Sequence, residues 1–90
     1  MSLRVLLFAQ VRELAGSAEI EIPVESQQET ITPQEIRQKV SVAVNADQSL
    51  STLLDRSMVA IDNEYMMDMS EAVPIRDGIE IAIIPPVSGG

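Results

Sequence analysis

The sequence predicts an α+β fold in which a small mixed β-sheet has one main helix packed on one of its faces. Two strand patterns lie near the two ends of the chain, over residues 3–9 and 79–84, where apolar side chains recur at every second position. A strong helix start lies between them at Thr32. The 90 residues make one domain. A domain of this size buries about 60–65% of its unfolded surface, so a compact core is possible but not a large one.

The first strand, over residues 3–9, has two different faces. One face carries Leu3, Val5 and Leu7, and the other carries Arg4, Leu6 and Phe8. Arg4 marks the second face as the wetter one. Residues 10–15 then suit a short helix, which ends at Gly16 because glycine readily takes the left-handed conformation at a helix end.

The second strand, over residues 19–24, alternates cleanly, with Ile20 and Ile22 directed inward and two glutamates outward. Pro23 fits an edge strand, since proline cannot donate a hydrogen bond to a neighbour. The link to the first strand is too short for a parallel crossover, so the two strands should pair antiparallel. Residues 25–30 are polar and indicate a loop.

The main helix begins at Thr32, which can act as the N-cap. Pro33 occupies the first helical position, and Glu35 is placed to complete a capping box. Asn45 can end the helix. An apolar stripe at helical spacing should face the sheet and consists of Ile36, Val40, Ala43 and Val44.

The middle of the chain predicts less regular structure. Residues 46–56 indicate a long connection that contains a helical turn with three leucines, and residues 58–61 a short strand followed by a turn at residues 62–64. Residues 65–73 are irregular and hold three methionines, which either fill the core or adapt to a partner.

The last strand, over residues 79–84, follows a tight turn at residues 76–78. It is apolar for most of its length and should therefore lie centrally, beside the first strand. This arrangement is a roll of the ubiquitin-like, β-grasp type. Because one main helix covers one face of the sheet, Phe8 and Ile84 should form an apolar patch on the open face, unless a loop covers them.

Composition excludes several classes of function. The net charge of −8 argues against nucleic acid and anionic membranes as partners; it fits a basic docking face on another protein or serves solubility alone. Without Cys or His, the chain has no thiol nucleophile, imidazole base or usual zinc site. No apolar run is long enough to span a membrane, and no signal peptide is recognisable, so the expected location is the cytosol.

The end of the chain holds the most plausible reactive group, its carboxylate. Residues 1–84 form the predicted β-grasp domain and residues 85–90 a flexible tail. Pro85 and Pro86 stop the last strand and act as a stiff spacer, and Gly89 and Gly90 form a slim tip that fits a narrow passage. The alternative is an incidental, frayed terminus.

Two stretches together closely resemble the MoaD-type sulfur carriers, the small subunits of molybdopterin synthase. They are Val5 to Gly16 (VLLFAQVRELAG) and Ile83 to Gly90 (IIPPVSGG). The helix start at Thr32 and the turn at residues 76–78 fit the same layout. Residues 25–31 and 64–73 depart from it by being longer.

The resemblance implies that Gly90 is adenylated by an E1-like enzyme that uses ATP, while this chain binds no cofactor and no metal. Sulfur then replaces AMP and leaves a thiocarboxylate, which donates sulfur to cyclic pyranopterin monophosphate in molybdenum cofactor biosynthesis. The chain would thus be the sulfur-donating subunit of a sulfurtransferase, with no catalytic side chains of its own.

The family layout also implies a heterotetramer of two large and two small subunits, in which each tail enters the active site of a large subunit. The implied contacts with that partner are made by Phe8, Tyr65, Ile84, Pro85, Pro86, Val87 and Ser88. Three alternatives stay open: a thiamine-type sulfur carrier, a ubiquitin-like modifier joined to lysines through Gly90, and an interaction module with an incidental tail.

Overall fold

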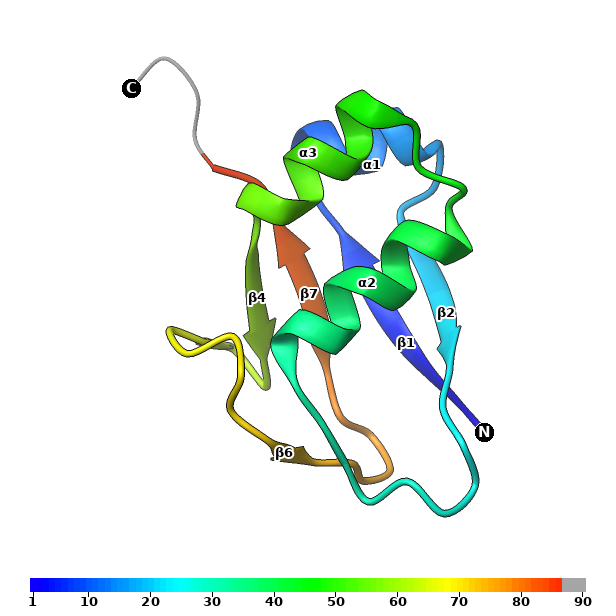
Figure 1. Ribbon diagram of the computed structural model, residues 1–90, viewed down its shortest axis with the longest axis vertical. Helices are drawn as coiled ribbons and strands as arrows, with labels where there is room; N and C mark the ends of the chain where they lie inside the picture. The colour runs from blue at the N-terminus through cyan, green and yellow to red at the C-terminus, as the bar shows by residue number, and fades with distance from the viewer. Residues whose placement is uncertain (87–90) are drawn as a thin grey trace.

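The computed structural model describes residues 1–86 and places β1 (Ser2–Leu7) beside β7 (Ile81–Ile84) at the centre of the main sheet (Figure 1). These two strands run parallel, with Leu6 opposite Ala82. The predicted position of the last strand is therefore confirmed.

The other strands of the main sheet pair antiparallel with their neighbours, in the order β2-β1-β7-β4-β5. They are β2 (Glu19–Pro23), β4 (Met58–Ile61) and β5 (Glu64–Tyr65). The sheet is thus mixed, as expected, and β2 lies at its edge.

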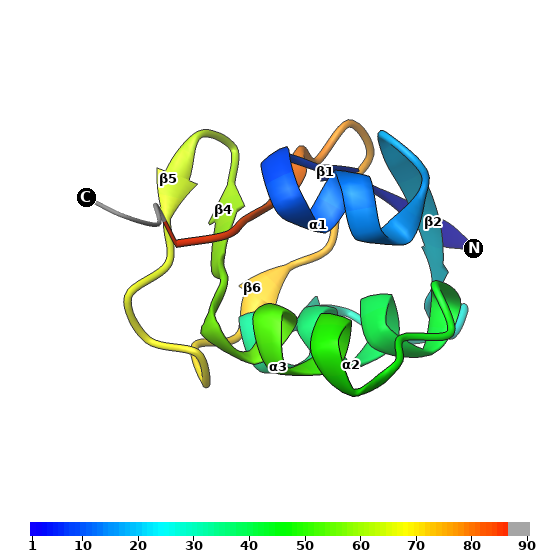
Figure 2. The ribbon, with the colours of Figure 1, turned by 90° about the horizontal axis from the view of Figure 1, so that it is seen from above.

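The helices α2 (Pro33–Ala43) and α3 (Gln48–Arg56) lie side by side along one side of the sheet, and α1 (Ala9–Ala15) contacts α3 (Figures 1 and 2). The core lies between these helices and the sheet. Its fully buried members from both layers include Val5, Leu7, Val11, Ile22, Ile36, Val40, Leu54, Val59, Ile81 and Ile83.

The start of α2 is capped as predicted, but the capping box is only half formed. Thr32 Oγ1 accepts a hydrogen bond from the backbone N–H of Glu35 at 3.1 Å. The Glu35 carboxylate accepts from Gln28 Nε2 at 3.0 Å, so a loop side chain takes the place of the Thr32 amide. The predicted apolar stripe is also wrong at one position, because Ala43 is exposed.

Residues 46–56 form more helix than the sequence analysis expected. Asp47 Oδ1 accepts from the N–H of Leu50 at 2.9 Å and starts α3, whose Leu50 and Leu54 are buried. At the other end of α3, Arg37 Nη1 donates to the carbonyl of Asp55 at 2.7 Å. An arginine of α2 therefore satisfies a carbonyl at the end of α3 and ties the two helices together.

A second, small sheet pairs β3 (Thr30–Ile31) with β6 (Val73–Pro74). The segment between β5 and β6 is irregular, as predicted. Of its methionines, Met66 packs against the core and Met67 is exposed. Within residues 1–86, no helix has the length and apolar character that crossing a membrane requires.

Two predicted turns are confirmed by their backbone geometry. Asp62 and Asn63 both have positive φ, 52° and 69°, as a two-residue hairpin between β4 and β5 requires. Gly78 has a φ of 78° in the turn before β7, and glycine suits this left-handed position because it has no Cβ.

Candidate functional site

The face of the main sheet that points away from α2 and α3 carries a row of apolar side chains. Leu6 lies opposite Ala82, Ala82 opposite Ala60, and Ala60 opposite Tyr65, so the row crosses β1, β7, β4 and β5. Directly opposed residues in paired strands project to the same face. The row therefore forms one continuous apolar strip.

This strip lies in a hollow of about 220 Å³. Phe8, Tyr65 and Ile84, three of the seven residues implied as partner contacts, all line it. Phe8 is 44% exposed and Tyr65 57% exposed, whereas Ile84 is half-buried. The structure thus brings together residues from three distant parts of the chain, and we call this surface the open-face hollow.

The exposure of Phe8 follows from a sharp turn between β1 and α1. Phe8 is the extended N-cap of α1, and Ala9 directly after it has a φ of 50°. A positive φ is uncommon for a residue other than glycine, asparagine or aspartate, and it costs alanine about 1–2 kcal/mol. Local strain of this kind is common at functional sites, and here it adjoins the side chain that lines the hollow.

A second hollow, of about 600 Å³, adjoins the first at the end of β7. Phe8 and Ile84 line both hollows, and Glu13 of α1 joins the two prolines in lining the second. Pro85 is buried and Pro86 is exposed. The remaining predicted tail residues Val87, Ser88, Gly89 and Gly90 lie outside the described residues, so the tail with its reactive carboxylate stays a prediction.

Sequence reasoning missed part of the hollow's neighbourhood. Met58 lies opposite Ile84, and Ala60 lies opposite Ala82, because β4 pairs with β7. The sequence predicts a strand at Met58 but does not indicate which face its side chain takes, and only the pairing of β4 with β7 places it beside Ile84. The adaptable thioether of methionine suits such a contact position.

The part of the open face farther from residues 85 and 86 is charged. Arg4 Nε lies 3.4 Å from Glu19 Oε2, and Arg76 pairs with Asp62. The backbone N–H of Glu80 donates to Asp62 Oδ1 at 3.1 Å. This hydrogen bond is the main cause that lowers the pKa of Asp62; desolvation opposes the shift, and Arg76 lowers the pKa further.

Asp68 is the other described carboxylate with a shifted pKa, and it lies in a loop. The hydroxyl and the N–H of Ser70 lower the pKa of Asp68, an exposed loop carboxylate outside both hollows. Among residues 1–86, no three carboxylates gather closely enough to hold a metal ion. The apolar lining of the open-face hollow suits an apolar group of another molecule, and the hollow lies next to the one lined by Pro85 and Pro86.

Comparison with known proteins gives one family match that covers nearly the whole chain. The profile described as the ThiS family matches residues 5–90. Two similar proteins are named molybdopterin synthase sulfur carrier subunit. The one from Anopheles gambiae is 34% identical over 97% of this chain and 90% of its own length. The one from Escherichia coli (strain K12) is 34% identical over 98% of this chain and 99% of its own.

Solved structures share the fold. SAMP1 from Haloferax volcanii has a TM-score of 0.71 and 27% identity, and the match covers 100% of both chains. A complex of subunits 1 and 2 of molybdopterin-converting factor from Helicobacter pylori 26695 contains a chain with a TM-score of 0.61 and 20% identity, again over 100% of both chains. At that identity the second likeness concerns the fold alone.

Proposed function

The chain belongs to the ThiS family, and from this premise we propose that it is the sulfur carrier subunit of a molybdopterin synthase. The observation that carries the proposal is the similarity, over almost the full length, to relatives that bear this name. The apolar open-face hollow beside Pro85 supports it, because a carrier must present its tail while the folded domain is held by a partner.

We propose that the reactive group is the carboxylate of Gly90. A carboxylate resists nucleophiles because of its charge and its poor leaving group. Attack of its oxygen on ATP, bound by an E1-like enzyme, would release pyrophosphate and leave an acyl-adenylate. A sulfur nucleophile would then form the C–S bond as AMP leaves, and the resulting thiocarboxylate would deliver sulfur without a cysteine in the carrier.

The domain would supply the docking surface for the large subunit. Phe8, Tyr65 and Ile84 would receive apolar side chains of that partner, and aromatic anchors of this kind often dominate binding energy. Gly89 would let the partner close around the tip and exclude water. The catalytic acids and bases and the phosphate binders would lie on the partners, and two large and two small subunits would assemble.

The test is the mass of the intact chain after incubation with an activating enzyme, ATP and a sulfur source. We expect a gain equal to the difference between sulfur and oxygen, localised to Gly90. A chain without Gly90 is the matched control and should keep the fold but gain nothing. An unchanged terminus in the full chain would refute the proposal and favour an interaction module with an incidental tail.

A second candidate is a ubiquitin-like modifier joined to target lysines through Gly90. One observation favours it: two similar solved structures are described as SAMP1 and as small archaeal modifier protein 1, both from Haloferax volcanii. Copurification separates the candidates. A sulfur carrier should bring down one large subunit in stoichiometric amount, whereas a modifier should appear as a ladder of covalent conjugates.

A further inference from the structure

The outer edge of β2 has backbone groups that point away from the sheet. The N–H of Leu7 donates to the carbonyl of Ala18 at 2.9 Å, and the N–H of Val24 donates to Met1 at 3.0 Å. In an antiparallel strand, every second residue directs its backbone N–H and C=O groups to the same neighbouring strand. The backbone groups of the even-numbered residues from 18 to 24 therefore point to β1. The odd-numbered residues of β2 therefore turn their backbone groups outward.

Those outward residues are Glu19, Glu21 and Pro23. The Glu19 carbonyl already accepts from Ser17 Oγ at 2.7 Å. Glu21 offers both an N–H and a carbonyl to an approaching strand, and Pro23 offers a carbonyl. β2 is the edge strand of the main sheet, and Figures 1 and 2 show it at one side of the molecule.

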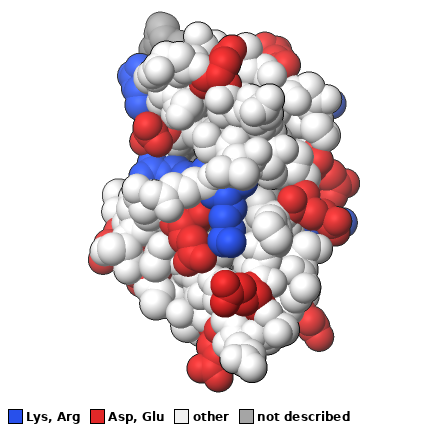
Figure 3. Space-filling view, turned by 45° about the vertical axis from the view of Figure 1, so that its right-hand side comes forward, with Lys and Arg blue, Asp and Glu red and all other residues white. Residues whose placement is uncertain are grey.

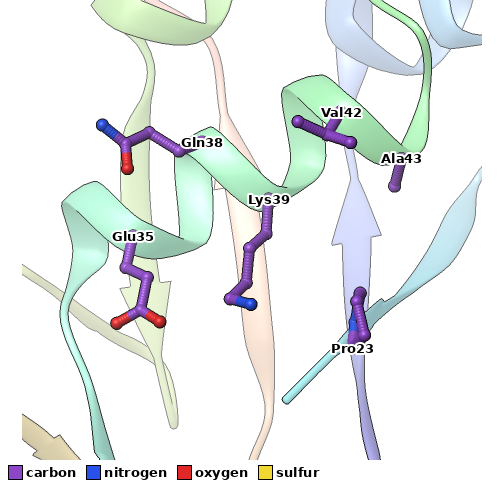
Figure 4. Close-up of a pocket in the computed structure, with 6 residues that line it drawn as sticks. All are labelled: Pro23, Glu35, Gln38, Lys39, Val42 and Ala43. Atoms are coloured by element: carbon purple, nitrogen blue, oxygen red, sulfur yellow. The ribbon is translucent and has the colours of Figure 1, made fainter. Parts of the chain in front are cut away.

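A groove of about 550 Å³ runs beside this edge, between β2 and α2 (Figure 4). Val42 is 81% exposed on its helix wall, and Pro23 stands on the strand side. Figure 4 shows Lys39 directed from α2 toward the strand side, whereas Gln38 points away. The groove is separate from the open-face hollow and shares no lining residue with it.

We propose that the β2 edge binds an extended segment of a partner protein as an added strand, with apolar residues at alternate positions and lysine or arginine between them. The alternation follows from the pleat of the sheet. Residues of the added strand that neighbour Ile22 would point to the helix side, where the groove exposes Val42. Residues that neighbour Glu21 would lie on the opposite face, beside the carboxylates of β2.

Charge complementarity commits the site to a basic partner rather than to a second copy of this chain. Antiparallel pairing of two β2 edges would place Glu19 and Glu21 of one copy against the same glutamates of the other, and opposed like charges are destabilising. Figure 3, with the β2 side turned forward, shows acidic side chains spread over this side and basic ones across its middle. A strand with basic residues would be attracted to the carboxylates of Glu19 and Glu21.

Amide spectra of the isotope-labelled full chain test the proposal, with a short blocked peptide of alternating lysine and valine as the probe. We expect shift changes concentrated in residues 19–23 and at Val42, and binding that weakens with salt. A peptide with glutamate in place of lysine should not bind. Absence of binding by the lysine peptide, or changes spread over all acidic surfaces, would overturn the proposal.

Charge exchange supplies the matched variants. Glu21→Lys should weaken binding of the lysine peptide about tenfold and let the glutamate peptide bind, because it exchanges the sign of the cross-strand contact. Glu71→Lys, which makes the same charge change in the loop before β6, should leave both peptides unchanged. If Glu71→Lys weakens the lysine peptide as much as Glu21→Lys does, the attraction is non-specific and the proposal fails.

Discussion

The two faces of the main sheet are made by alternate residues of the same strands, yet their side chains are buried to different extents. In β7, Ile83 is fully buried beneath the helices, and Ile84, the next residue, is half-buried on the open face. β4 repeats the pattern, with Val59 fully buried and Met58 exposed. The covered face therefore contributes more to the free energy of folding than the open face, which under the proposed function would contact the partner.

The largest expected effect is the difference in the free energy of unfolding between Ile83→Ala and Ile84→Ala. Ile83→Ala should lower the free energy of unfolding by about 2–5 kcal/mol, because it removes buried apolar surface and leaves a cavity. Ile84→Ala should cost clearly less and act on partner binding instead. Urea unfolding of both variants measures the difference, and equal losses of stability would show that the open face is part of the core.

The next effect concerns Phe8→Asp. Binding of the large subunit should weaken by about 2 kcal/mol, roughly 30-fold, as for other aromatic anchors. Stability should not fall, because Phe8 is the N-cap of α1 and aspartate is a good N-cap residue. Titration calorimetry and urea unfolding provide the two measurements.

Leu14→Asp is the matched control for Phe8→Asp. Leu14 is similarly exposed, at 49%, on the same helix, but it does not line the open-face hollow. Its substitution should leave the affinity unchanged. If both variants lose affinity alike, or if Phe8→Asp unfolds the domain, then Phe8 does not have the role proposed here.

A smaller effect tests the turn that exposes Phe8. Ala9→Gly should raise the free energy of unfolding by about 0.5–1 kcal/mol, because glycine relieves the left-handed strain at a smaller entropic cost. The thermal midpoint measures this change. A lower midpoint would show that Ala9 is not strained and that the exposure of Phe8 has another cause.

The smallest effect concerns the charged part of the open face. The folded state lowers the pKa of Asp62, so this group stabilises the fold above its unfolded pKa of about 3.9 and loses that contribution as the pH falls through the lower folded value. The stability difference between the protein and Asp62→Asn should therefore shrink in acid.

Unfolding midpoints at neutral and acidic pH measure the Asp62 effect. Asp77→Asn, which removes one carboxylate from the turn before β7, is the matched control for the change in net charge. A difference that grows as the pH falls would contradict the assigned sign.

Short sequence patterns predict the elements that form the covered face, whereas features that depend on pairing between distant strands cannot be predicted from such patterns. Thr32 and the alternation in β1 and β7 identify their elements from the sequence alone, because a cap and a two-residue period are local. The sequence predicts only a helical turn where α3 lies, although Asp47 is a good N-cap. The pair β3 and β6 could not be predicted, since two-residue strands have no periodicity.

Residues in and near the open-face hollow could also be predicted only where short sequence patterns place them. Phe8 and Ile84 could be placed on the open face because each strand has a clear inward set. Met58 could not be placed beside Ile84, because that contact depends on the register between β4 and β7. Ala43 fits the helical stripe of α2 but is exposed in the structure. The helical period predicts which face of α2 points to the sheet. It does not predict how far the sheet extends beneath that face.

The central claim is that the folded domain presents a carboxyl end whose reactivity is supplied by other proteins. Its most direct test is a chain carrying a chemically installed thiocarboxylate at Gly90, mixed with the large synthase subunit and cyclic pyranopterin monophosphate. Molybdopterin should form without ATP and without an activating enzyme, and the unmodified chain should give none. Absence of product from the thiocarboxylate form, or product from the unmodified chain, would contradict the account.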